Sequence, residues 1–316
     1  MKVSWQQVSE RLVDPIDHGA LVLDSDGTTL VSASGRRYPI RDGQPILLPT
    51  EGLESGGWRF APIVTTDATR PKPIRRLRAT FKSFKQLLRR GVGGQGAGLR
   101  LVEFVHELDS GGRPRALVIG GATVGDGAAP LVDDPTIDVV SFDVYPTAAT
   151  TFVADGHRIP LADASVSAVW IQAVLEHVYR PEVVVAEIVR VLEPGGLVYA
   201  ETPFLQPVHE AAYDYLRFNM SGHRMLFARF DEIAAGPLGG PAAVLNLGIR
   251  GLVGGLTRSA AAARVAYGLT QPLVLLDRFV PEPWRVDYAT GSYFLGRLSD
   301  EHPRDFDAAA VYRGAG

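Results

Sequence analysis

Residues 116–125 read ALVIGGATVG, a short apolar run that passes directly into a glycine-containing turn. A second apolar run, IDVVSFD at residues 137–143, ends in the carboxylate of Asp143. Short apolar runs bounded by turn residues are typical of strands buried in a parallel sheet. Glycines let the backbone of the turn approach a ligand closely, and a carboxylate at a strand end can accept hydrogen bonds from ribose hydroxyls. The pair indicates a nucleotide-type site at the carboxyl end of a sheet.

Strands and helices continue to alternate along the chain. Apolar runs at residues 168–171 and 197–201 predict two further buried strands, and residues 182–192 predict a helix between them. Residues 293–298 predict a late strand that returns to the sheet. Such alternation predicts an α/β fold, in which helices cover both faces of a mostly parallel sheet.

Several short motifs after the second strand narrow the class. Asp155 and Gly156 form an acidic-glycine pair, followed by IPLADASV at 159–166, LEHV at 175–178 and RVLEPGG at 190–196. Together with the glycine turn and Asp143, these motifs resemble the type 11 group of class I S-adenosylmethionine-dependent methyltransferases. The resemblance implies a Rossmann-like class I methyltransferase sheet, S-adenosylmethionine (SAM) as the cofactor and methyl transfer as the reaction.

The resemblance also implies which residues contact the cofactor. Asp143 would bind the ribose, Asp155 the adenine amino group, and Gln172 and Ala173 the sulfonium end. The expected contact set is Gly120, Gly121, Ala122, Gly125, Asp143, Val144, Asp155, Gly156, Gln172, Ala173 and His177.

The strand end before the turn departs from the family pattern. The family usually has an acidic residue just before the first glycines, where this chain has Val118 and Ile119, and a glycine where it has Ala122. The amine of the methionine moiety therefore lacks an expected partner.

The residues after the fourth predicted strand carry the groups expected to face the methyl acceptor. The run at 203–218 resembles the Pro-Phe, Pro-x-His and Asp-Tyr-x-Arg-Phe pattern of methyltransferases from bacterial glycan and natural-product pathways. His209 is expected to be the general base, with Asp214 as its orienter or as an alternative base. A histidine that only hydrogen-bonds a loop fits the same pattern. The residues expected to contact the acceptor are Phe204, Tyr215 and Arg217, the last either binding an anionic group or pairing with Asp214. No metal site is expected.

Residues 1–50 predict a small separate β module. Within it, YPIRDGQPILL at 38–48 resembles the signature of the small zinc-ribbon-like activator subunits of tRNA and protein methyltransferases. Members of that family often carry two early cysteines where this chain has Asp14 and Asp17, and the chain contains no cysteine. Because structural zinc takes four ligands, commonly thiolates, we favour a structural cap held by its own apolar core over a zinc site.

Residues 51–112 are expected to connect this module to a methyltransferase domain at 113–316. Residues 70–90 hold nine basic side chains and no acidic one, with apolar residues at helical spacing. This pattern predicts a basic amphipathic helix that packs on the catalytic domain, contacts an anionic membrane or binds a phosphorylated substrate. A helix is expected at 99–108, and an apolar helical lid or cap at about 233–280.

Overall composition limits the function classes. The net charge is only -3, which gives no reason to expect specific nucleic-acid binding. The N-terminal stretch lacks the pattern of a secretory signal, and no apolar run is long enough to span a bilayer, so a cytoplasmic enzyme is expected. A homodimer is left open.

Three functions fit the sequence to different degrees. The first is O-methylation of a glycan or a natural-product small molecule. The second is an NAD-dependent oxidoreductase, which the glycines and Asp143 permit but the motifs at 155–156 and 194–196 disfavour. The third is a noncatalytic SAM-binding regulatory or scaffold protein, suggested by the activator-like N-terminal module and the altered glycine turn.

Overall fold

The computed structural model describes residues 2–49, 95–108, 112–123, 127–209, 211–300 and 307–315. The basic helix expected at 70–90, most of the connection at 51–112, and Gly125 lie outside the described residues. Within the described part, no helix is long and apolar enough to cross a membrane.

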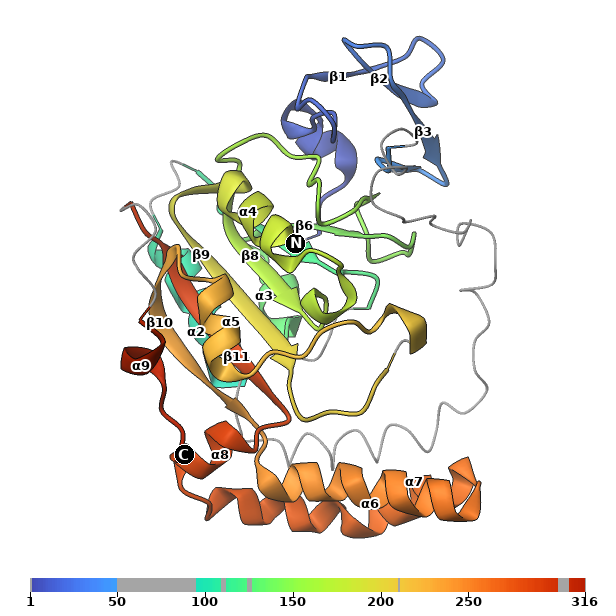
Figure 1. Cartoon of the computed structure of the whole chain (residues 1–316). Coiled ribbons are helices and arrows are strands. Elements are labelled where there is room, and N and C mark those ends of the chain that lie inside the picture. Colours follow the sequence, from blue (N-terminus) through green and yellow to red (C-terminus); the bar gives the residue numbers. More distant parts are fainter. Residues whose placement is uncertain are drawn as a thin grey trace.

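A seven-stranded sheet forms the centre of the molecule (Figure 1), with the strand order β10-β11-β9-β8-β5-β6-β7. Strands β5 to β9 run parallel, and β11 is antiparallel to both of its neighbours. The strands are β5 (Arg115–Ile119), β6 (Asp138–Asp143), β7 (Phe152–Val153), β8 (Val166–Gln172), β9 (Leu192–Pro203), β10 (Phe230–Leu238) and β11 (Gly291–Leu298). The predicted α/β class with a Rossmann-like sheet is confirmed.

Helices cover both faces because alternate strand residues point to opposite sides. In β5, Leu117 belongs to the core that includes Ile188 of α4 (Pro181–Val191). Its neighbour Val118 belongs to a second core that includes Leu101 of α2 (Gln95–Glu107). The short α3 (Ala129–Val132) lies on the α2 side, since Leu131 is in the same core.

The strand order reverses at β5. From β5 the chain moves outward through β6 and β7, then returns to pair β8 against the other side of β5. In open α/β sheets, ligands bind in the crevice outside the carboxyl ends of the strands at such a reversal. The glycine turn after β5 and the end of β8 at Gln172 flank this position.

The expected helical lid is only partly helical. Residues 233–238 belong to β10, which pairs along β11, so the prediction of helix there was wrong. The pairing partner lies more than fifty residues further on, and a local apolar pattern cannot reveal it. The apolar residues beyond form α6 (Pro241–Thr257), α7 (Ala260–Thr270) and the 3-10 helix η6 (Gln271–Arg278).

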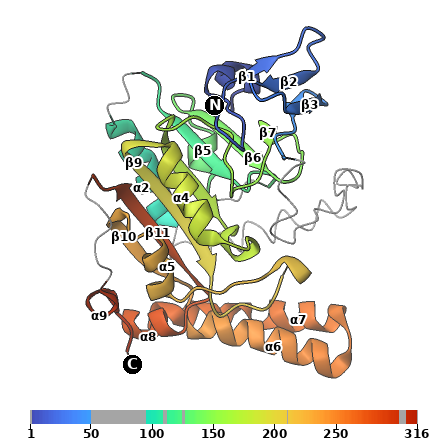
Figure 2. The same ribbon diagram turned by 45° about the horizontal axis from the view of Figure 1, so that its top comes forward.

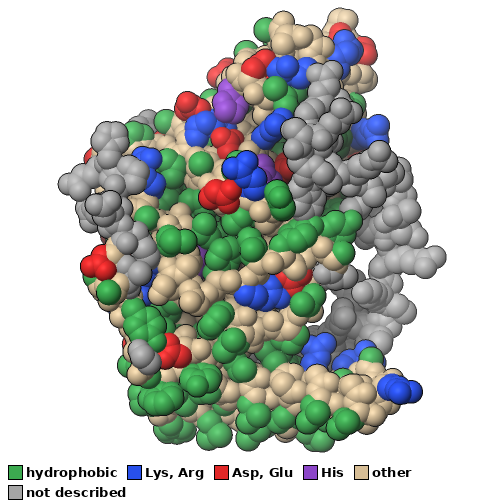
Figure 3. Space-filling model, viewed as in Figure 1, with side chains coloured by type: hydrophobic (Ala, Val, Ile, Leu, Met, Phe, Trp, Pro, Cys, Tyr) green, Lys and Arg blue, Asp and Glu red, His purple; other side chains and the backbone are tan. Residues whose placement is uncertain are grey.

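These helices pack as a long hairpin along one end of the molecule (Figures 1 and 2). Leu256 and Leu269 are 78% and 77% exposed, and hydrophobic side chains gather over this end in Figure 3. The helix α8 (Glu282–Asp287) leads from the hairpin back to β11.

The N-terminal module is an antiparallel sheet of β1 (Leu21–Leu23), β2 (Thr29–Ser32), β3 (Arg37–Arg41) and β4 (Gln44–Pro45), preceded by the 3-10 helix η1 (Trp5–Arg11). It lies beside β6 and β7 (Figure 2). The amide of Leu47 donates to the carbonyl of Val153 at 2.8 Å, and Gln44 Nε2 donates to the carbonyl of Thr150 at 2.7 Å. Trp5 and Leu47 share one core with Leu117 of β5. The module therefore does not have the separate apolar core that was expected.

An ion-pair cluster connects segments of the module at the two positions where members of the activator family often carry cysteines. Arg36 Nε donates to Asp14 Oδ2 at 2.8 Å, and its Nη2 pairs with Asp17. Asp14 is fully buried, and its Oδ1 also accepts from the amide of Ile16 at 2.7 Å and from the hydroxyl of Tyr38 at 3.1 Å. Both carboxylates are thus engaged with one guanidinium.

Candidate functional site

The two glycines after β5 let the turn lie against β6. Gly120 has φ +77°, and a Cβ there would come within 2.3 Å of the Val174 side chain. A Cβ on Gly121 would come within 2.8 Å of Ser141. The amides of both glycines donate to the carbonyl of Phe142, at 3.1 and 2.9 Å. A larger residue at Gly121 would push the turn away from β6, the strand that carries Asp143, and one at Gly120 would clash with Val174 after β8.

Asp143 is joined to that turn through its carboxylate. Its Oδ2 accepts a hydrogen bond of 3.0 Å from the amide of Ala122, and its Oδ1 accepts one of 3.3 Å from the amide of Tyr145. Burial raises the pKa of Asp143 above its ordinary value, although hydrogen bonds from Ala122, Tyr145 and Val144 oppose the shift. Val144 follows directly in the chain.

Asp155 lies one strand further out at the same edge of the sheet. Asp143 is in register with Val153 of β7, and the amide of Ala154 donates to the carbonyl of Asp143 at 3.0 Å. Asp155 Oδ1 accepts hydrogen bonds from the amide of His157 at 2.9 Å and from its ring Nδ1 at 2.7 Å. Burial raises the pKa of Asp155, but the hydrogen bonds and charge of His157 outweigh burial and leave it below its ordinary value.

Gly156 is fixed by packing on α4. A Cβ there would meet Val184 at 3.4 Å. Of the predicted cofactor residues on this side, the structure brings the glycine turn, Asp143, Asp155 and Gly156 to one edge, formed by the carboxyl ends of β5, β6 and β7.

Gln172 ends β8 on the other side of the reversal. Its Nε2 donates to Glu201 Oε2 at 2.5 Å, and the hydroxyl of Tyr199 donates to Glu201 Oε1. Ala173 follows with φ +53°, and its amide donates to the carbonyl of Glu201 at 3.0 Å. Glu201 was not among the predicted site residues, but it places a carboxylate beside the predicted sulfonium end.

Glu176, His177 and His209 form a compact cluster beyond β8. Glu176 and His177 lie in the 3-10 helix η4 (Leu175–His177), and His209 lies in the loop after β9. His177 Nε2 and His209 Nε2 are 3.1 Å apart, and Glu176 Oε1 lies 3.7 and 3.5 Å from them. The amide of Tyr215 donates to the carbonyl of Glu176 at 2.9 Å, which holds the two segments together. Burial raises the pKa of Glu176 to about 7, and the charge of Arg217 opposes the shift.

Asp214 supports His209 from behind. Its Oδ2 accepts from the backbone amide of His209 at 2.7 Å and lies 3.3 Å from His209 Nδ1. Arg217 pairs with both oxygens of this buried carboxylate. The hydrogen bonds and charge of Arg217 hold the pKa of Asp214 well below its ordinary range, with burial opposing. Of the two alternatives for Arg217, the structure contains the pair with Asp214.

Comparison with known proteins found a family model that matches the central part of this sheet. The methyltransferase domain family matches residues 122–200, a range that contains Asp143, Asp155, Gln172 and Glu176. Residues 122–200 are therefore similar to a methyltransferase domain, in agreement with the resemblance that the sequence motifs indicate.

The relatives found cover parts of the chain. An uncharacterized methyltransferase from Mycobacterium ulcerans (strain Agy99) is 37% identical over 102 residues, which are 32% of this chain and 40% of that protein. A UPF0434 protein from Marinomonas sp. (strain MWYL1) is 51% identical over 41 residues, which are 13% of this chain and 63% of that protein. In both cases the match covers less than two thirds of the relative. A solved structure from Galdieria sulphuraria, described as a sarcosine dimethylglycine methyltransferase, is similar with a TM-score of 0.44 and 16% identity, covering 65% of this chain and 86% of that one.

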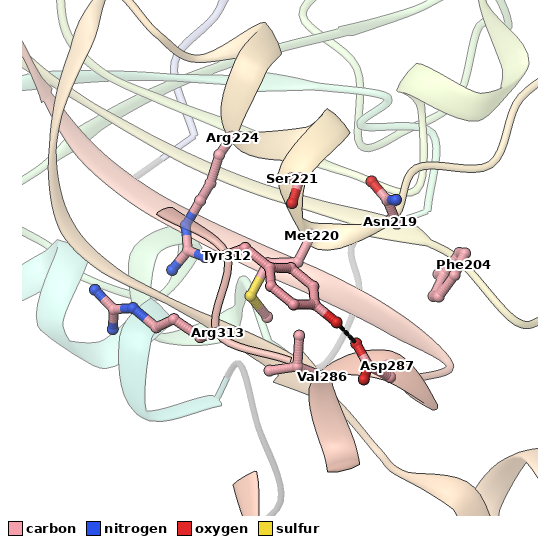
Figure 4. A pocket seen from close by; sticks show the side chains of 9 residues that line it. All are labelled: Phe204, Asn219, Met220, Ser221, Arg224, Val286, Asp287, Tyr312 and Arg313. Carbon is pink, nitrogen blue, oxygen red and sulfur yellow. Dashed lines mark hydrogen bonds between the residues drawn. The ribbon is translucent and has the colours of Figure 1, made fainter. Parts of the chain in front are cut away.

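Figure 4 shows a pocket of about 180 Å³ whose lining contains none of the predicted cofactor residues. It lies between α5 (Met220–Leu226), α8 and the C-terminal segment that contains α9 (Ala308–Val311). Its lining residues are Phe204, Asn219, Met220, Ser221, Arg224, Val286, Asp287, Tyr312 and Arg313. Phe204, predicted to contact the acceptor, thus lines a pocket that contains none of the histidines. Tyr215 is exposed next to Asp214.

The sequence prediction does not include two carboxylates that the structure places at the carboxyl edge of the sheet. Glu176 lies in the LEHV motif, where its place beside a histidine is a usable signal. Glu201 stands at the end of a predicted strand, the same signal that identified Asp143.

Proposed function

We propose that the chain transfers the methyl group of SAM to an oxygen atom of a small-molecule or glycan acceptor. The observation that carries the proposal is the placement of Asp143 and Asp155 at the ends of neighbouring parallel strands. Beside them lies a turn in which Gly120 and Gly121 let the backbone pack closely against Val174 and Ser141. This is the edge at which open α/β sheets bind nucleotides.

The nucleoside half of the cofactor fits the acidic edge. Asp143 already accepts backbone hydrogen bonds from Ala122, Tyr145 and Val144, but a carboxylate has about four acceptor positions, so one remains for a ribose hydroxyl. Both hydrogen bonds from His157 reach Oδ1 of Asp155, so Oδ2 is the atom that would accept from the adenine amino group.

Glu201 would replace the acidic partner that the sequence lacks before the glycine turn. It lies at the carboxyl end of β9 and accepts a hydrogen bond from Gln172, which the family resemblance assigns to the sulfonium end. A carboxylate there would bind the ammonium group of the methionine moiety by charge and hydrogen bonding. Gln172 and Tyr199 would fix its orientation.

The cluster of Glu176, His177 and His209 is the place at which the acceptor would be activated. SAM supplies an electrophilic methyl group, and transfer breaks its S–CH₃ bond and forms an O–CH₃ bond as the acceptor hydroxyl loses a proton. His209 Nε2 would take that proton, while Asp214 would hold the ring through Nδ1 and stabilise the imidazolium. Much of the rate would come from aligning the acceptor oxygen with the methyl carbon.

Calorimetry with the full chain tests the cofactor assignment. SAM and its demethylated product should each bind with 1:1 stoichiometry, and NAD should not bind. Asp155→Ala should weaken SAM binding about 5- to 150-fold through the loss of a charge-assisted hydrogen bond. Asp163→Ala, which removes an exposed carboxylate on a loop after the same strand, is the matched control and should leave binding unchanged.

Turnover separates the enzyme from a noncatalytic relative. With a panel of hydroxylated glycans and small molecules and labelled SAM, we expect label in the acceptor and none with His209→Gln. Tight SAM binding without transfer to any acceptor would instead favour a regulatory or scaffold protein, which the activator-like N-terminal module also suggests. NAD binding without SAM binding would contradict the proposal.

A further inference from the structure

We propose that Glu176, His177 and His209 together bind one divalent transition-metal ion. Each residue offers one ligand atom, and the three atoms lie within 4.8 Å of one another. Binding does not require methyl transfer, but an ion on His209 Nε2 would replace the general-base role proposed above for that atom; only the catalytic role of the ion rests on the proposed reaction.

The spacing of the ligand atoms matches a common ion. Two nitrogens that are each about 2.1 Å from one metal ion, at an angle of 90–110°, lie roughly 3.0–3.4 Å apart. The two Nε2 atoms of His177 and His209 are 3.1 Å apart. Glu176 Oε1, at 3.5 and 3.7 Å from these nitrogens, needs to move only a few tenths of an ångström to complete the set.

An oxygen lies behind each imidazole, on the side away from the cluster. His177 Nδ1 is 2.9 Å from the carbonyl oxygen of Tyr213, which can only accept, so Nδ1 carries the hydrogen. His209 Nδ1 is 3.3 Å from Asp214 Oδ2, an oxygen of the carboxylate that is also paired with Arg217. With the hydrogen of neutral His209 also on Nδ1, toward the carboxylate of Asp214, both Nε2 atoms carry lone pairs, 3.1 Å from each other. A carbonyl or carboxylate behind each ligating histidine is the usual outer arrangement of a protein metal site.

Glu176 supplies a second, independent observation. Its side chain is completely buried, and neither of its carboxylate oxygens has a hydrogen-bond partner among the residues that the structure describes. A buried carboxylate without a partner is costly, because desolvation is not compensated. A cation coordinated between Oε1 and the two imidazoles would remove that cost and the repulsion between the two Nε2 lone pairs.

The donor set indicates the class of ion and its chemistry. Two imidazoles and one carboxylate suit Zn²⁺, Fe²⁺, Mn²⁺, Co²⁺ or Ni²⁺ rather than Ca²⁺, which takes oxygen ligands. Three protein ligands leave at least one coordination position open, as in catalytic sites. In the proposed methyl transfer, the acceptor oxygen would occupy that position, and the ion would favour loss of its proton to solvent. His209 would then be a ligand and not the general base.

Metal binding can be measured without SAM and without an acceptor. The full chain, free of any histidine tag, is stripped with a chelator and titrated with Co²⁺ and Zn²⁺ by calorimetry, with the visible absorption of Co²⁺ as a second readout. We expect one ion per chain and at least a tenfold loss of affinity in each of Glu176→Gln, His177→Ala and His209→Ala. His106→Ala is the matched control, because His106 pairs with Asp134 at 3.0 Å outside the cluster, and it should leave the affinity unchanged.

Three outcomes would overturn the metal site. The first is no binding by the stripped wild type. The second is binding that all three variants retain, which would mean an ion held elsewhere. The third is a nitrogen NMR spectrum at pH 7 that shows a proton shared between His177 and His209 and that does not change when Co²⁺ is added. His209 is 40% exposed, so His209→Ala should fold even if Glu176→Gln does not. Metal binding with no methyl transfer would contradict only the proposed reaction.

Discussion

Asp143 Oδ2 accepts a hydrogen bond of 3.0 Å from the backbone amide of Ala122. This bond connects the carboxylate at the end of β6 with the turn after β5, the two features that first indicated a nucleotide-type site. The carboxylate therefore holds the turn in place, and in the proposed function it also binds the ribose. A substitution at Asp143 must be interpreted with both in mind.

Asp143→Ala is expected to weaken SAM binding by about 1 to 3 kcal/mol, through the loss of a ribose hydrogen bond and of the turn contact. Calorimetry measures the affinity, and thermal unfolding separates a binding defect from a folding defect. Asp143→Asn keeps one acceptor oxygen for Ala122 and should lose less affinity than Asp143→Ala. An affinity unchanged in both variants, with the fold intact, would remove Asp143 from the site.

The sequence allowed most of the central sheet to be predicted, because β5, β6, β8 and β9 are buried on both faces and read as continuous apolar runs. The ends of these strands then placed Asp143 and Gln172 at the carboxyl edge of the sheet, where the structure has them. β7 consists of only Phe152 and Val153, too short to give a periodic signal.

The cluster at Glu176 could not be predicted for a different reason. Its burial depends on contacts of His209 and Tyr215 with η4, which join residues more than thirty positions apart in the chain. Local pattern carries no information on such a contact. The same holds for Arg36, whose two acidic partners lie 22 and 19 residues earlier in the chain.

Arg36→Met should lower the free energy of unfolding by about 2 to 4 kcal/mol, because it leaves the fully buried carboxylate of Asp14 without its cation. Chemical denaturation gives the total, and hydrogen exchange should show the loss over β2 and β3. Asp17→Ala is the matched comparison: that carboxylate is 44% exposed, and its removal should cost clearly less than the loss of Arg36, because solvent screens an exposed ion pair. Equal costs for the two variants would mean that the buried pair does not hold the module.

Asp277→Ala should loosen the helical hairpin. Asp277 is fully buried, and its two oxygens accept from the amides of Ala242 and Ala243, at 2.8 and 3.1 Å, at the start of α6. Gly240, the N-cap residue of α6, has no side chain for this purpose, so the cap comes from η6. Loss of a cap costs about 1 to 2 kcal/mol, and hydrogen exchange in the first turn of α6 should rise accordingly. Asp277→Asn keeps one acceptor and should show a smaller rise; no change in either variant would contradict the capping role.

His223 should make stability depend on pH in the acid range. The ring is buried in α5, with Nδ1 2.9 Å from the hydroxyl of Ser292 and Nε2 without a partner among the described residues. Burial, assisted by the charge of Arg224, lowers the pKa of His223 from 6.5 to about 3. The unfolded chain therefore binds a proton between pH 6.5 and 3 that the folded chain does not. Above pH 6.5 the ring is neutral in both states and does not affect stability. As the pH falls from 6.5 toward 3, protonation of the unfolded chain lowers the free energy of unfolding by up to about 1.4 kcal/mol per pH unit.

Replacing the ring tests this directly, because His223→Gln can still hydrogen-bond Ser292 but does not titrate. The difference in unfolding free energy between the wild type and His223→Gln cancels the acidic groups that titrate in the same window. That difference should move in favour of the variant as the pH is lowered from 7 to 4, measured by urea denaturation at each pH. A difference that stays constant over this range would mean that His223 is protonated equally in the folded and unfolded chains, and that the buried position does not exclude its charge.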